Sequence, residues 1–174
     1  MIAKPQAAEV TLPSDAVVRV VRSFHAPREL VYRAYTEPDL MKRWLLGPPG
    51  WSMPVCEMDV RVDGNFRWQW RSDEDGTEFG FHGTFLEVDA PGRLRHTEFY
   101  DPGDMGGDMG QDEGPALVTL SLTERDGITT LTTDIEYPSR KSRDAALSTG
   151  MTDGMELSYQ NLDALLASEV GSAS

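Results

Sequence analysis

The stretch FRWQWRSDEDGTEFGFHGTF, residues 66–85, predicts a β-hairpin with one aromatic face. Aromatic residues alternate with charged or small residues on both sides of a turn at Asp73–Gly76, which is the period of a half-buried strand. If Ser72 pairs with Thr77 across the turn, the aromatic face holds three pairs: Trp70 with Phe79, Trp68 with Phe81, and Phe66 with Gly83. An aromatic ring over a glycine of the neighbouring strand is a stabilising arrangement.

The opposite face of this hairpin is polar. The same register places Arg71 opposite Glu78, which is an attractive pair, and Arg67 opposite His82. A slip by one residue would mix aromatic and charged side chains on both faces, so the pattern favours a single register. His82 is therefore expected on the outer, solvated face.

A second hairpin is predicted over residues 116–137, where Asp126-Gly127 is the two-residue signal of a type I′ turn. Direct pairing places three pairs on its apolar face: Leu122 with Leu131, Leu120 with Thr133, and Val118 with Ile135. The other face is rich in hydroxyl groups. One apolar and one solvated face are typical of an antiparallel sheet that is covered on one side.

The rest of the chain supplies further strands and helices. Strands are predicted at 17–24, 56–62 and 93–100, and two short helices at 27–45. Residues 142–167 repeat apolar side chains at steps of three and four, which predicts one long helix; a bend or a close approach would explain Gly150 and Gly154 in it. The order predicts an α+β fold, a curved antiparallel β-sheet wrapped around a long C-terminal helix, with two short helices after the first strand.

The domain organisation is simple, since neither repeats nor a boundary between domains is evident. We expect a flexible N-terminal leader over 1–14, a single domain over 15–168 and a flexible C-terminus over 169–174. Residues 101–115 hold five acidic residues, five glycines and no basic residue, which predicts a solvated loop. Their spacing lacks the pattern of a calcium-binding loop.

The composition argues against several classes of function. The 174 residues carry a formal net charge of -13, which repels nucleic-acid phosphates and anionic lipids. The single cysteine, Cys56, can form no internal disulfide and cannot hold a structural zinc alone. We find neither a long apolar segment nor a secretory signal. We therefore expect a cytoplasmic protein with no nucleic-acid partner, no membrane partner, no metal and no cofactor.

Four stretches resemble a known superfamily when they are taken in order. They are FHAPRELVYRAYTEPDLMKRWLLGPPGW (24–51), MDVRVDGNFRWQW (58–70), GTFLEVDAPGRL (83–94) and SRDAALSTGMTDGMELSYQNLDALL (142–166). They are similar to the SRPBCC superfamily of START/birch-pollen-allergen-like helix-grip proteins, and within it to the branch named for the activator of heat-shock protein 90 ATPase homologue. The resemblance implies a helix-grip fold with a deep cavity between sheet and helix, but no single reaction. Asp63 departs from the branch, which usually has a second glycine there.

Aromatic side chains on the predicted inner face are candidates for the walls of such a cavity. Their simplest interpretation is core packing; the functional interpretation is a pocket for a hydrophobic small molecule. The methionines of the long helix would line the other side, although methionine also fills gaps in cores. The candidate ligand-binding residues are Trp44, Trp51, Trp68, Trp70, Phe79, Phe81, Phe85, Glu98, Tyr100, Met151, Met155 and Tyr159.

His96 and Glu98 form the candidate acid–base group of the sequence. If Leu94 points inward, then His96, Glu98 and Tyr100 on the same strand do too. A carboxylate in an apolar pocket has a raised pKa and can act as a base or as a polar anchor. In the alternative, a bulge flips the strand, so that Phe99 packs inward and Glu98 is solvated.

Three functions remain open. The first is a non-catalytic module that holds a small apolar or amphipathic molecule. The second is an enzyme of the polyketide cyclase/dehydratase or hydrolytic type, with Glu98 as general base and His96 beside it. The third, implied by the family alone, is a co-chaperone or stress-response protein that contacts a chaperone ATPase. Sheet edges and short-helix surfaces could also pair two copies as a homodimer.

Overall fold

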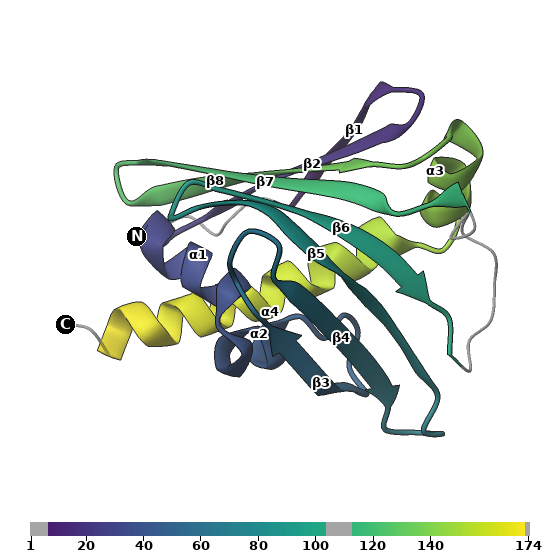
Figure 1. The fold of residues 1–174 in the computed structure, drawn as a ribbon. Coiled ribbons are helices and arrows are strands. Elements are labelled where there is room, and N and C mark those ends of the chain that lie inside the picture. The colour runs from purple at the N-terminus through teal and green to yellow at the C-terminus, as the bar shows by residue number, and fades with distance from the viewer. Residues whose placement is uncertain (1–6, 104–112, 173–174) are drawn as a thin grey trace.

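The computed structural model describes residues 7–103 and 113–172 (Figure 1). In this part of the chain two strands come first, followed by two short helices, six strands and two helices. The strands are β1 (Glu9–Ser14), β2 (Val17–Phe24), β3 (Trp51–Met58), β4 (Asn65–Ser72), β5 (Glu78–Asp89), β6 (Arg93–Asp101), β7 (Ala116–Arg125) and β8 (Ile128–Glu136). The helices are α1 (Arg28–Thr36), α2 (Pro38–Trp44), α3 (Arg140–Leu147) and α4 (Met151–Ser172).

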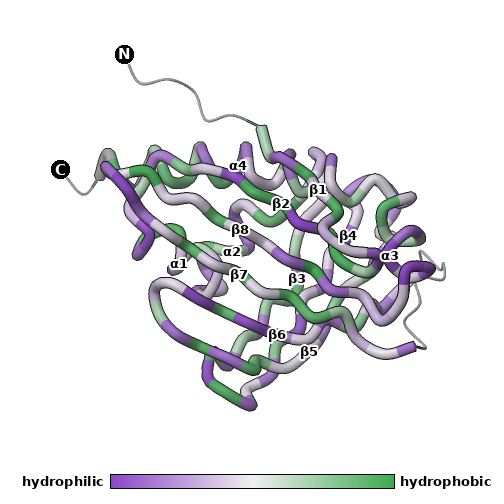
Figure 2. The backbone as a smooth tube through the Cα atoms, turned by 90° about the horizontal axis from the view of Figure 1, so that it is seen from above, coloured by the Kyte–Doolittle hydropathy of each residue, from purple (hydrophilic) through white to green (hydrophobic). Residues whose placement is uncertain are grey.

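The described strands form one antiparallel sheet in the order β1-β2-β8-β7-β6-β5-β4-β3. Figure 1 shows the sheet curving around α4, with α1 and α2 at one end of it. Hydrophobic and hydrophilic residues alternate in short segments along the strands (Figure 2), so the sheet turns an apolar face toward the helices. The predicted α+β helix-grip fold is confirmed.

Both predicted hairpins have the expected register. The Ser72 N–H donates to the Thr77 carbonyl at 2.8 Å, and β4 and β5 form the three aromatic-face pairs that the alternation predicts. A Cβ added to Gly83 would collide with the Thr97 carbonyl of β6 and lie 2.8 Å from Cε1 of Phe66, so the neighbouring strand and the ring leave no room for a larger residue. The three predicted pairs of β7 with β8 are also those observed.

The ends of the chain differ from the expectation. Residues 9–14 form β1 instead of a flexible leader, and Val10 pairs with Val20 of β2. All six residues of β1 are exposed, so the strand lacks the alternation that marks a half-buried strand. At the other end α4 continues to Ser172, past the expected limit of 168. Most of the predicted acidic loop, residues 104–112, lies outside the described residues.

The single predicted long helix is interrupted and forms α3 and α4. The Ser139 hydroxyl caps α3 by accepting a hydrogen bond from the Ser142 N–H at 3.1 Å. Gly150 has a φ of 79°, a left-handed conformation that separates the two helices. The predicted bend therefore lies at Gly150, whereas Gly154 is an ordinary residue inside α4.

The two glycines predict opposite effects of the same substitution. Gly150→Ala should lower the free energy of unfolding by about 1–2 kcal/mol, because an alanine is strained at positive φ. Gly154→Ala should raise it by about 0.5–1 kcal/mol, since a Cβ there meets nothing within 4 Å. Urea denaturation of both variants measures the two changes. Effects of the same sign would contradict the assignment of the bend to Gly150.

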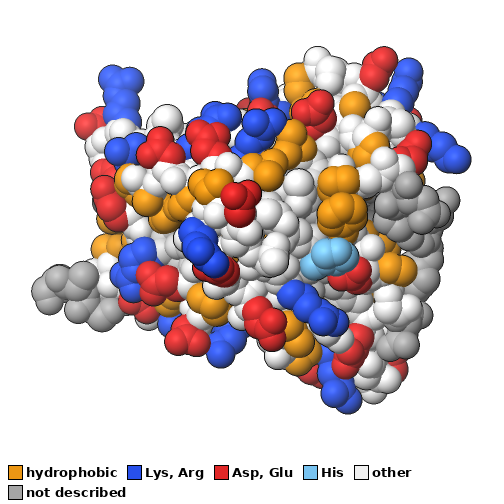
Figure 3. Space-filling model, viewed as in Figure 1, with side chains coloured by type: hydrophobic (Ala, Val, Ile, Leu, Met, Phe, Trp, Pro, Cys, Tyr) orange, Lys and Arg blue, Asp and Glu red, His pale blue; other side chains and the backbone are white. Residues whose placement is uncertain are grey.

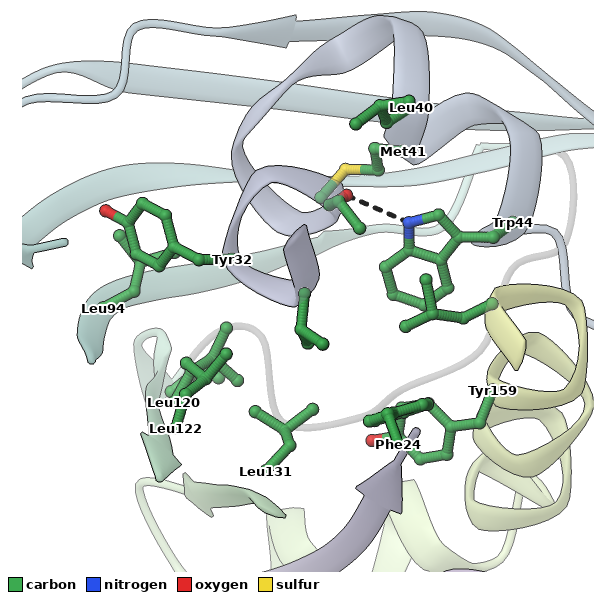
Figure 4. Packing of buried hydrophobic residues seen from close by; sticks show 14 of the residues in the cluster. Phe24, Tyr32, Leu40, Met41, Trp44, Leu94, Leu120, Leu122, Leu131 and Tyr159 are labelled. Carbon is green, nitrogen blue, oxygen red and sulfur yellow. Dashed lines mark hydrogen bonds between the residues drawn. The ribbon is translucent and has the colours of Figure 1, made fainter. Parts of the chain in front are cut away.

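The core lies between the sheet and the helices. Figure 4 shows Trp44 and Met41 of α2, Tyr159 of α4 and Phe24 of β2 around one interior region. The Trp44 side chain is fully buried, and the rings of Phe24 and Tyr159 meet edge-on with their centroids 5.6 Å apart. These contacts join both short helices, the first long strand and α4 in one apolar cluster.

Candidate functional site

The inner face of β6 carries the candidate acid–base residues. Leu94 and His96 are buried and Glu98, two residues further along, is half-buried. A bulge is present, but it lies on the neighbouring strand, because the register of β5 against β6 shifts around Leu86. The alternation of β6 is therefore intact, and Glu98 shares the face of His96. This excludes the alternative in which a bulge turns Glu98 to the solvated face.

The imidazole of His96 is bound to Glu98 and bordered by aromatic rings. Its Nε2 atom lies 3.0 Å from Oε2 of Glu98. The rings of Phe66, Trp68 and Phe85 approach the imidazole edge-on, with centroids at 5.1, 5.8 and 5.9 Å. A carboxylate–imidazole pair in such surroundings can anchor a polar group or transfer a proton.

Two nitrogen atoms at this place are buried without a partner. Trp68 Nε1 and His96 Nδ1 make no hydrogen bond within the described residues. The other buried tryptophans differ, since Nε1 of Trp44 and Nε1 of Trp70 donate to backbone carbonyls at 2.9 and 2.6 Å. Leaving a buried polar group unpaired costs about 1–3 kcal/mol. Trp68 and His96 therefore mark the position at which a polar partner is expected.

Tyr137 joins this group from the end of β8, although the sequence did not single it out. Its hydroxyl donates to Sδ of Met151, the first residue of α4, at 3.3 Å. Burial and, after it, the negative charge of Glu98 raise the pKa of Tyr137. The sequence pattern could have predicted this position, because Tyr137 lies two residues past Ile135 and so continues the inward-facing positions of β8.

A second group of predicted residues gathers on β3 to β6. Its rings are in contact: the centroids of Trp70 and Phe79 are 5.3 Å apart, those of Trp51 and Phe79 5.4 Å, and those of Phe81 and Tyr100 5.5 Å. Trp70 is buried and the other four side chains are half-buried. This aromatic cluster (Trp51, Trp70, Phe79, Phe81 and Tyr100) offers accessible apolar surface to a small molecule.

The remaining predicted residues lie in or against the core. Trp44 and Tyr159 are held by the packing that Figure 4 shows. Burial raises the pKa of the Tyr159 hydroxyl to about 12. Phe85 is buried as well, but it borders the imidazole described above. Met151 and Met155 are half-buried against the core.

The outer face of the sheet at β5 and β6 has more polar and charged side chains than the inner face. His82 lies there as predicted, with Nδ1 2.7 Å from Oδ2 of Asp101 and its ring stacked on Phe99. A hollow of about 190 Å³ is lined by Arg67, Trp68, Gln69, Glu78, Phe79, Gly80, Asp101 and Gly103. Figure 3 shows one face of the molecule, on which charged side chains of both signs surround short rows of hydrophobic ones. Three charged residues, Arg67, Glu78 and Asp101, line this hollow beside Trp68 and Phe79.

Residues 7–103 and 113–172 contain no group of three or more His, Cys, Asp or Glu side chains placed to hold a metal ion. In the same part of the chain, no helix combines the length and apolar character needed to cross a membrane.

Comparison with known proteins identifies the family. The family model described as Activator of Hsp90 ATPase homolog 1-like protein matches residues 25–167. A crystal structure from Rhodobacter sphaeroides is 31% identical, covers 94% of this chain and 99% of its own, and has a TM-score of 0.83. Structures from Chromobacterium violaceum (27% identity, 88% and 98% coverage, TM-score 0.73) and Nitrosomonas europaea (25%, 92% and 99%, 0.77) are also similar. No curated protein matches the sequence.

Proposed function

The chain belongs to the Activator of Hsp90 ATPase homolog 1-like family, and from this premise we propose that it binds a small amphipathic molecule between the sheet and α4. The apolar part of the ligand contacts the aromatic cluster and the methionines of α4. The polar part meets Trp68, His96 and Glu98. Binding alone, without turnover, is the proposed activity.

The observation that carries this proposal is the pair of unpartnered nitrogen atoms in an apolar interior. Trp68 Nε1 and His96 Nδ1 are buried, and the rings of the two residues have centroids 5.8 Å apart. A core that served stability alone would gain from apolar side chains at these positions. Two such groups on rings in contact therefore support a ligand at this position.

The apolar surroundings support the same function. Four rings of the aromatic cluster are half-buried, and so are Met151 and Met155 on the helix side. Apolar walls with few convergent polar groups are typical of small-molecule sites. Methionine side chains can change rotamer to admit ligands of different shape.

Nile red, a neutral dye that fluoresces in apolar surroundings, should bind saturably at one site per chain. A neutral probe is required because a net charge of -13 repels anionic dyes. Met151→Phe should weaken binding about tenfold, since the larger side chain takes up room beside Tyr137. Leu157→Phe is the matched control, because Leu157 lies on the exposed side of the same helix.

Absence of saturable binding to the folded wild-type protein would contradict the proposal. So would equal affinities of wild type, Met151→Phe and Met155→Phe, provided that circular dichroism shows all three to be folded. Two filling variants are included because either one alone can disturb the start of α4.

An enzyme is the second proposal, and the 3.0 Å contact between His96 and Glu98 favours it. An imidazole that a carboxylate orients is a common general base, and the carboxylate of such a pair can also accept the proton itself. Hydrolysis of 4-nitrophenyl butyrate should then exceed the buffer rate and be lost in Glu98→Gln. Asp101→Asn, which changes the outer-face histidine pair instead, should retain it.

A further inference from the structure

We propose that the polar group of the ligand is a neutral hydroxyl, which accepts a hydrogen bond from Trp68 Nε1 and donates one to His96 Nδ1. This inference rests on the proposed binding function and narrows the ligand class to alcohols and phenols. The juxtaposition that carries it is the edge-on contact of the Trp68 and His96 rings, whose centroids are 5.8 Å apart and each of which has a buried nitrogen atom unpartnered within the described residues.

The donor and acceptor roles follow from the partner of His96. An ionised carboxylate only accepts hydrogen bonds, so Glu98 requires the imidazole to carry its proton on Nε2, 3.0 Å away. In a neutral imidazole the other nitrogen is then an acceptor. The indole of Trp68 is a donor only. The site therefore presents one donor and one acceptor.

The surroundings of the His96 side chain are buried and largely aromatic. The side chain is 4% exposed and three aromatic rings border it. A neutral imidazole already gives Glu98 the hydrogen bond that the carboxylate needs. A second buried charge is thus unnecessary.

A hydroxyl is the smallest group that matches this pattern, because it accepts and donates at one oxygen atom. An ether oxygen would satisfy Trp68 but leave His96 Nδ1 unpaired. A carboxylate would face the lone pair of Nδ1 and add negative charge close to Glu98. The expected order of affinity is hydroxyl, then ether, then carboxylate.

Access to the two nitrogen atoms needs a side-chain movement. Both atoms are covered by neighbouring atoms, so a ligand reaches them only when a neighbouring side chain rotates. We expect Met151 to make this movement, because its flexible, half-buried side chain contacts Tyr137, and Tyr137 lies near enough to Glu98 for the carboxylate charge to raise its pKa.

Three naphthalene derivatives of similar size test the inference by isothermal titration calorimetry. Wild type should bind 2-naphthol about tenfold more tightly than 2-methoxynaphthalene, and 2-naphthoate most weakly. Trp68→Phe and His96→Phe each remove one hydrogen bond, so each should reduce the preference for 2-naphthol to about twofold or less. His82→Phe, the matched histidine change on the outer face, should keep the full preference.

The outcomes separate the two proposals. If the folded protein binds none of the three compounds, the binding function itself is wrong. Equal binding of 2-naphthol and 2-methoxynaphthalene would overturn only the hydroxyl assignment. Tighter binding of 2-naphthoate would also overturn it, because two donors would then face the ligand. Should His96→Phe fail to fold, Trp68→Phe provides the same comparison.

Discussion

Replacing Trp44 by alanine is expected to lower the free energy of unfolding by about 4 kcal/mol. The side chain is fully buried at the meeting point of α1, α2 and α4, so its loss leaves a cavity that the core can fill only in part. The change also removes the hydrogen bond from Nε1 to the Ala34 carbonyl and the edge contact with Tyr35, whose ring centroid lies 4.8 Å away. Urea denaturation monitored by circular dichroism measures the effect.

A control variant distinguishes the loss of buried apolar atoms from the loss of exposed ones. Val62→Ala removes apolar atoms from a side chain that is 55% exposed, and should change the free energy of unfolding by less than about 0.5 kcal/mol. A loss below about 1 kcal/mol for Trp44→Ala would contradict the packing described here.

Replacing Arg22 by alanine is expected to cost about 3 kcal/mol. This arginine on β2 is 2% exposed and forms ion pairs with two residues of α4, at 3.0 Å to Glu156 and 2.7 Å to Asp163. Its guanidinium also lies over the Phe24 ring, 5.0 Å from the centroid. Removing Arg22 would leave two carboxylates in partly buried positions without their cation.

Arg19→Ala on the same strand is the matched control. Arg19 pairs with Asp134 at 2.7 Å, but the Arg19 side chain is exposed and that of Asp134 only half-buried, so the loss should stay below about 1 kcal/mol. Equal losses in the two variants would show that burial of Arg22 does not hold β2 to α4.

The same ion pairs predict a pH dependence. Burial would raise the pKa of Glu156, but hydrogen bonds from Arg22, the Ala8 N–H and Gln160 outweigh it and lower the pKa below its usual 4.5. A lowered folded-state pKa stabilises the protein above the unfolded pKa, and this stability is lost as the pH falls through the folded-state value. The difference in stability between wild type and Arg22→Ala should therefore shrink below about pH 4.5.

Where apolar and polar residues alternate strongly along a strand, the sequence predicted the structure down to single pairs of residues. The aromatic hairpin has one register because a slip would bury Arg67 and Arg71 and expose Trp68 and Trp70. Strand β1 was not predicted, because neither of its faces is buried. The break between α3 and α4 depends on the positive φ of Gly150. The repeat of apolar residues along the predicted helix gives no information about this backbone angle.

The candidate site was predictable in part. Placing Leu94 inward correctly put His96 and Glu98 on one face, since the bulge lies on β5. Alternation cannot tell which strand absorbs an extra residue, so the solvated alternative stayed open. The alternation also cannot show that the Trp44 N–H donates to a carbonyl while the Trp68 N–H has no partner, because such partners come from elements distant in sequence.

The central claim is that a ligand reaches the buried nitrogen atoms of Trp68 and His96. The most direct measurement is a ¹H–¹⁵N spectrum of the indole N–H groups during titration with 2-naphthol, since the chain has only four tryptophans. The signal of Trp68, assigned with Trp68→Phe, should move downfield as its N–H gains a partner, while that of Trp44 stays in place. Saturation of binding without a shift of the Trp68 signal would contradict the claim.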